Sequence, residues 1–146
     1  MNGSLAGTVH VASGATLGGT NTITSAVTLT SGAILAPGAA TNQIGTLTLS
    51  GTAPALSGRN LVADVSTTSG VCDKLVLTGT VDLTGLTVTV KIPGTLPVTN
   101  MYVLLSSTAL SGTPTLAGDL SYPWYLSVKN NTLVLSKICG TMVSFF

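Results

Sequence analysis

A short pattern that returns along the chain limits the possible folds more than any other feature of the sequence. The first two copies are 18 positions apart and pair Val9 with Val27, Val11 with Leu29, Gly14 with Gly32, Ala15 with Ala33, and Leu17 with Leu35. The unit returns with drifting spacing at Leu47, Leu49 and Gly51, at Leu75, Leu77 and Gly79, and at Val81, Leu83 and Gly85. A unit this short cannot bury its own apolar face, so it must stack on its neighbours.

Each unit alternates apolar residues with polar ones. Val27 and Leu29 point to one side of an extended chain, whereas Thr28 and Thr30 point to the other. No long stretch has the 3.6-residue period of a helix. The sequence therefore predicts an all-β protein, a parallel β-helix with coils of about 18 to 22 residues. A β-sandwich is the alternative, because it also consists of short strands separated by turn signals.

The composition excludes several classes of protein. Only 6% of the residues are charged, there is no Glu, and the formal net charge is +1, so the chain lacks the basic stripe of a nucleic-acid binder and the carboxylates of an acidic metal buffer. Hydrophobic residues make up 45% of the chain, which argues against disorder. The longest apolar runs are too short to cross a membrane as a helix. No cofactor-binding motif is present, and we predict no cofactor.

The chain changes character near residue 96. Most aromatic residues lie beyond this point, and a solenoid needs an end that covers its edge strands. We therefore predict coils over residues 1–95 and a capping region over 96–146 that continues the same core. Residues 102–105 and 126–135 are its expected strands, the second a hairpin that turns at Asn130 and Asn131.

Three segments resemble a known family. They are Ser31-Gly-Ala-Ile-Leu-Ala-Pro-Gly38, Gly45-Thr-Leu-Thr-Leu-Ser-Gly51 and Asp73-Lys-Leu-Val-Leu-Thr-Gly79, and they are similar to autotransporter-associated β-strand repeats of secreted bacterial passenger proteins. The resemblance covers about residues 5–137. It implies a right-handed parallel β-helix outside the cell or at its surface, with the role of a stalk or spacer and in some cases of an adhesin. No segment of this sequence resembles the membrane barrel of that family.

The ionisable side chains offer little material for catalysis. Asp64 and Asp82 are 18 positions apart and should both point outward, so stacked coils would bring them together as a like-charge pair. Asp73 is interpreted as a turn residue. The single histidine, His10, is expected on the surface, and no catalytic signature surrounds it. We predict that the protein is not an enzyme.

Two further groups of residues have two interpretations each. Tyr122, Trp124 and Tyr125 either plug the open end of the solenoid or stack on sugar rings. Cys72 and Cys139 are either small buried hydrophobic residues or the two halves of a disulfide, which an extracellular location would permit. No metal site is expected from this cysteine spacing.

Pairs of threonines alternate with one apolar residue at several places. They are Thr22 and Thr24, Thr28 and Thr30, Thr46 and Thr48, and Thr87 and Thr89. If these pairs stacked on one face, they would resemble the threonine arrays of β-solenoid ice-binding proteins. The simpler interpretation is that Thr is the polar residue best suited to strands.

These observations favour a non-enzymatic extracellular structural module, such as a stalk, spacer or filament segment of a bacterial surface or secreted protein. The alternative is an adhesin or carbohydrate-binding module. The expected partners are the rest of a longer passenger chain, a second copy of the chain, or surface glycans. Neither nucleic acid nor insertion into a membrane is expected.

Overall fold

The computed structural model describes residues 7–38, 44–51, 54–68, 70–92, 101–118 and 124–137, which form strands and no helix. The chain winds around three faces in turn. The first face carries β1 (Val9–Val11), β4 (Val27–Leu29), β9 (Thr80–Asp82) and β12 (Ala109–Ser111). The second carries β2 (Thr16–Gly19), β5 (Ile34–Pro37), β7 (Asn60–Asp64), β10 (Thr87–Lys91) and β13 (Thr115–Gly118). The third carries β3 (Thr22–Ile23), β6 (Thr46–Leu49), β8 (Lys74–Leu77), β11 (Tyr102–Ser106), β14 (Trp124–Lys129) and β15 (Thr132–Lys137).

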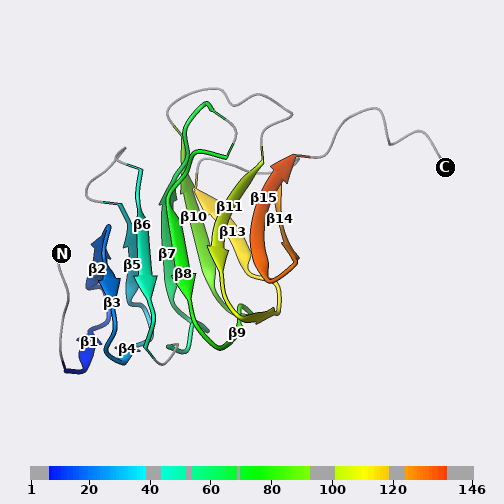
Figure 1. Ribbon diagram of the computed structural model, residues 1–146. Coiled ribbons are helices and arrows are strands. Elements are labelled where there is room, and N and C mark those ends of the chain that lie inside the picture. Colours follow the sequence, from blue (N-terminus) through cyan, green and yellow to red (C-terminus); the bar gives the residue numbers. More distant parts are fainter. Residues whose placement is uncertain are drawn as a thin grey trace, which may run out of the picture.

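The protein is a parallel β-helix (Figure 1). Among the described residues, every ladder from β1 to β13 is parallel and joins strands of successive coils, whereas a sandwich would contain antiparallel neighbours. Paired residues lie 18 positions apart between Leu17 and Leu35, 26 between Leu35 and Leu61 and 30 between Leu75 and Leu105. The predicted spacing was therefore right for the first coil and too short for the later ones.

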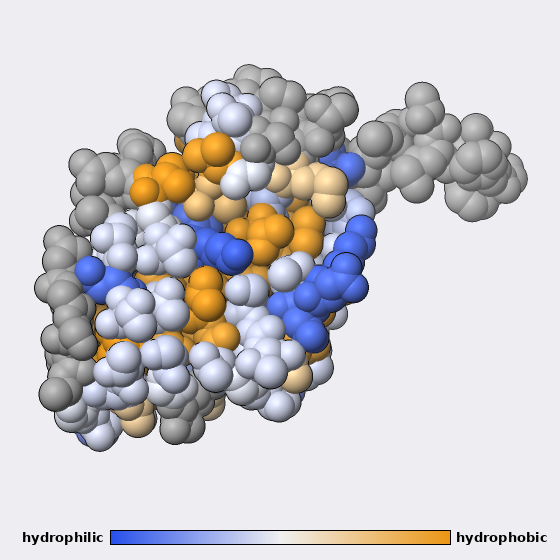
Figure 2. Space-filling model, in the orientation of Figure 1, coloured by the Kyte–Doolittle hydropathy of each residue, from blue (hydrophilic) through white to orange (hydrophobic). Residues whose placement is uncertain are grey.

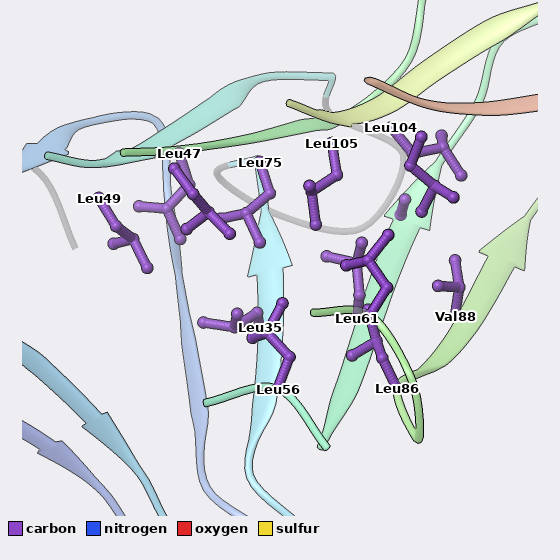
Figure 3. Close-up of a cluster of buried hydrophobic side chains, with 14 of the residues drawn as sticks. Leu35, Leu47, Leu49, Leu56, Leu61, Leu75, Leu86, Val88, Leu104 and Leu105 are labelled. Atoms are coloured by element: carbon purple, nitrogen blue, oxygen red, sulfur yellow. The ribbon is translucent and has the colours of Figure 1, made fainter. Parts of the chain in front are cut away.

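The core consists of rows of leucine side chains stacked from coil to coil inside the solenoid. Leu47, Leu75 and Leu105 are paired across β6, β8 and β11 and are completely buried. Figure 3 shows them side by side, with Leu35 and Leu61 opposite. Because each of these leucines lies against its counterpart one coil away, the inward faces of β6, β8 and β11 are covered at this level of the strands.

A stack of tight turns lies at the corner between the first and second faces. Gly14, Gly32 and Gly58 each donate a backbone hydrogen bond to the glycine of the next coil, ending at the carbonyl of Gly85, over distances of 2.9 to 3.1 Å. All four glycines have φ between +77° and +88°, a conformation that is costly for other residues. Ser13, Ser31, Ser57 and Thr84 precede them.

The solenoid ends in an antiparallel hairpin. β14 and β15 turn at Asn130 and Asn131, whose φ values are +50° and +60°, and β15 pairs antiparallel with β11. The predicted cap strands and the asparagine turn are therefore confirmed. Parallel pairing continues through β13, so the antiparallel part begins later than residue 96. The buried side chains of Trp124, Leu133 and Leu135 belong to the same core cluster as those of the coils.

Repeated units that look alike in the sequence lie on different faces. The Val27 unit is in β4 on the first face, whereas the Leu47 unit is in β6 on the third. Every face needs the same alternation, so the pattern alone does not distinguish them. For the same reason the threonine pairs are spread over all three faces: Thr28 is paired with His10, and Thr46 with Lys74. The idea of one threonine array is therefore wrong.

The first face is interrupted at residues 54–57. The turn at Gly58 stacks between those at Gly32 and Gly85, which places this segment between β4 and β9. It forms no strand there. Pro54 has no N–H to donate to a ladder, and this accounts for the break.

Candidate functional site

The structure separates the two aspartates that were expected to form a pair. Asp64 is buried at the end of β7 on the second face, whereas Asp82 is exposed at the end of β9 on the first. The 18-residue spacing predicted a stack, but the coils here are longer, so this spacing does not correspond to one coil. The prediction that both carboxylates point outward into one site is therefore wrong.

Asp64 lies instead close to Asp73, which is a buried residue and not an exposed turn former. Only 1% of Asp73 is exposed. Its carboxylate accepts hydrogen bonds from the backbone N–H of Gly45, at 2.8 Å, and of Asp64, at 2.9 Å. Its own N–H donates to the carbonyl of Asp64 at 2.8 Å. The Asp73 carboxylate therefore links the start of β6, the end of β7 and the start of β8.

Burial controls the ionisation of Asp73. It raises the pKa of the carboxyl from its ordinary value of 3.8 to about 6, because the charged form is poorly solvated. The two backbone N–H groups oppose this shift, and the nearby Asp64 carboxylate adds to it. A carboxyl with this pKa changes charge in a mildly acidic solution.

We expect the protein to be more stable at pH 5 than at pH 7. The folded pKa lies above the unfolded one, so the folded state binds more protons between them, and this stabilisation is complete below pH 3.8 and is lost as the pH rises through 6. The expected gain in the free energy of unfolding from pH 7 to pH 5 is about 1 kcal/mol. Urea denaturation at both pH values measures it. Asp73→Asn, which does not titrate, should lose this pH dependence, and a wild type less stable at pH 5 would contradict the assignment.

The aromatic candidates divide between the core and the surface. Trp124, at the start of β14, is 8% exposed and belongs to the core cluster. The Lys137 ammonium nitrogen lies 5.9 Å from its ring centroid, a cation–π distance. Tyr125 is 38% exposed, and Tyr122 lies outside the described residues. The end of the solenoid thus buries the tryptophan and leaves one tyrosine ring accessible.

Of the two cysteines, only Cys72 is among the residues that the structure describes. The Cys72 sulfur lies 3.3 Å from the Val103 carbonyl oxygen, to which its thiol donates a hydrogen bond when it is reduced. Burial, with a contribution from the Asp73 carboxylate, raises the pKa of this thiol to about 12, so it is an unreactive thiol at neutral pH. Cys139 lies outside the described residues, and the disulfide stays a prediction.

A surface pocket lies at the interruption of the first face. It is a cavity of about 310 Å³ between the 54–57 segment and β9, extending to Thr84. Asp82 is on its wall and accepts a hydrogen bond from the N–H of Thr84 at 2.9 Å. The Thr84 N–H and hydroxyl lower the pKa of the Asp82 carboxyl. The sequence alone did not predict this pocket, although Pro54 within an otherwise regular repeat was a signal of the break.

Arg59 stabilises the other side of the interruption. Its Nε donates to the Leu29 carbonyl at 3.0 Å, and a second guanidinium nitrogen contacts the same oxygen. Its remaining nitrogen donates to the Ser57 carbonyl at 2.5 Å. The guanidinium therefore joins β4 to the 54–57 segment by hydrogen bonds. A strand ladder does not join them, because residues 54–57 form no strand.

The surface carries few charged groups. Figure 2 shows the third face covered mostly by weakly polar and hydrophobic residues, with much of the hydrophilic colour gathered over β14 and β15. Within the described ranges, no group of three or more His, Cys, Asp or Glu is placed to hold a metal ion. The same ranges contain no helix of the length and hydropathy that a membrane crossing requires. His10 is exposed on β1, as expected.

No protein-family model, curated protein or solved structure matches the chain.

Proposed function

We propose that the protein is a non-enzymatic structural module, a capped segment of a β-helix that serves as a stalk or spacer in a secreted or surface protein of a bacterium. The resemblance to autotransporter-associated repeats suggested this role. The observation that supports it most is the difference between the two ends of the solenoid. β1 and β3 are terminal strands of parallel ladders, whereas the other end carries the antiparallel β14–β15 hairpin.

The difference between the ends suggests how such a module extends. A parallel strand at the end of a ladder offers its edge to another coil in the same register. Each added coil lengthens the stack by about 4.8 Å. The hairpin, in contrast, turns the chain back at the far end. In this proposal, further coils stack next to β1 and β3.

Duplicating residues 9–26 tests this proposal. Val9 is paired with Val27, so this segment is one complete first coil. A chain with two copies in tandem should unfold in one transition at a higher urea concentration, because it gains an interface between coils. The control carries the same 18 residues after Phe146, at the other end of the sequence, and should show no gain. A tandem chain that unfolds earlier, or in two separate steps, would contradict a stackable stalk.

An adhesin or carbohydrate-binding module is the second candidate. It rests on Tyr125, whose ring is accessible beside the buried Trp124. Aromatic faces of this kind stack on sugars. The titration with sugars described below reports on this position as well.

A further inference from the structure

The interruption of the first face leaves one edge of β9 open. The N–H of Leu83 donates to Ser111 of the next coil, and alternate residues of a strand direct their amide groups to opposite sides. The amide groups of Thr80 and Asp82 therefore face the 54–57 segment. Among the described residues, no backbone hydrogen bond links residues 54–57 to β9, and the nearest one runs from the Gly58 N–H to the Gly85 carbonyl.

The side chains around this edge are hydrogen-bonding groups over an apolar floor. Ser57, Thr80 and Thr84 supply hydroxyls, and Asp82 supplies a carboxylate. Hydrogen bonds from Thr84 lower the pKa of the Asp82 carboxyl, so it stays an acceptor at neutral pH. Val81 and Leu56 are buried beneath them. The pocket thus combines donors, acceptors and a small apolar contact surface.

The charge and shape of the pocket exclude most other ligands. No Lys or Arg is among the described residues that line it, so an anion would meet only the negative Asp82. A divalent cation would find one carboxylate, which already accepts from Thr84. A peptide strand would find an edge only three residues long. A neutral ring with several hydroxyls matches the donors and acceptors.

We propose that this pocket binds one hydroxyl-rich sugar ring of a neutral glycan. The 310 Å³ cavity is at the small end of ligand sites and holds a single ring. Asp82 and the open amide groups of β9 bind neighbouring hydroxyls, and the exposed Ala55 contacts a C–H face of the ring. Binding of a single ring is weak, with a dissociation constant on the order of millimolar. This site goes beyond the structural role and uses none of the aromatic residues.

Titration of the ¹⁵N-labelled protein with three methyl glycosides, of mannose, galactose and glucose, tests the proposal by NMR. At least one of them should shift the amide signals of Ser57, Thr80, Asp82 and Thr84 in a saturable manner. No saturable shift with any of the three sugars would overturn the proposal. Saturable shifts confined to Tyr125 and its neighbours would also overturn it, in favour of the adhesin alternative.

Two variants test the site in different ways. Asp82→Ala removes the carboxylate and should weaken binding at least tenfold. Ala55→Leu fills the pocket from its exposed rim and leaves the Asp82 to Thr84 hydrogen bond in place, so it covers the case in which the Asp82 variant does not fold. Thr28→Ala, on β4 of the same face, is the control and should bind as the wild type does. Unchanged affinity in a folded Ala55→Leu protein would overturn the proposal, and the structural role would be unaffected.

Discussion

Replacing Leu75 by alanine is expected to lower the free energy of unfolding by about 2 to 5 kcal/mol, because it opens a cavity in the middle of the core. Leu75 is completely buried on β8 and is paired with Leu47 on one side and Leu105 on the other. Both neighbours belong to coils that stack on it, so neither can move into the space without disturbing its own ladder. The truncation therefore removes contacts from three successive coils at once.

Urea denaturation monitored by the fluorescence of Trp124 measures this loss. Trp124 is the single tryptophan of the chain and is buried, so its emission reports unfolding. The matched control is Val76→Ala on the same strand, where the half-exposed side chain points outward. The control should lose about 1 kcal/mol or less. Equal losses in the two variants would contradict the assignment of Leu75 to the inside.

Gly85→Ala is expected to destabilise the protein by about 2 to 3 kcal/mol, through two separate costs. The first is backbone strain, because Gly85 has φ +84°. The second is steric, because an added Cβ would lie 2.5 Å from Ser57 Oγ and 3.3 Å from Ser57 Cα in the turn stacked on it. Side-chain rotation of Ser57 relieves the first contact but not the second.

The substitution Gly14→Ala measures the backbone strain without the steric contact. Gly14 occupies the same position in the first turn of the stack, with φ +78°, and an added Cβ would meet no atom within 4 Å. Gly14→Ala should therefore cost only the strain, about 1 to 2 kcal/mol. Combining Ser57→Ala with Gly85→Ala should recover part of the difference. Thermal or urea unfolding of these three variants checks this, and equal losses for Gly14→Ala and Gly85→Ala would contradict the steric contact between the turns.

These two predictions use features that the sequence already indicates. The alternation in Leu75-Val-Leu77 assigns one side of the strand to the interior. The glycines mark turn positions with positive φ, a backbone conformation that is strained for a residue with a Cβ. Asn130 and Asn131 likewise indicate the hairpin turn of the cap, since asparagine tolerates positive φ. Each of these is a local property, because it depends on a residue and its immediate neighbours in the chain.

The tertiary structure alone decided which elements meet. A two-residue alternation is the same on all three faces, so it could not assign the Leu47 unit to the third face or predict that coils lengthen from 18 to 30 residues. Loop length at a corner is almost free of energetic constraint. For this reason the pairing of Asp73 with Asp64 was not visible in the sequence. The pocket beside Asp82 required two facts together, namely that Pro54 cannot join a ladder and that its segment lies between β4 and β9.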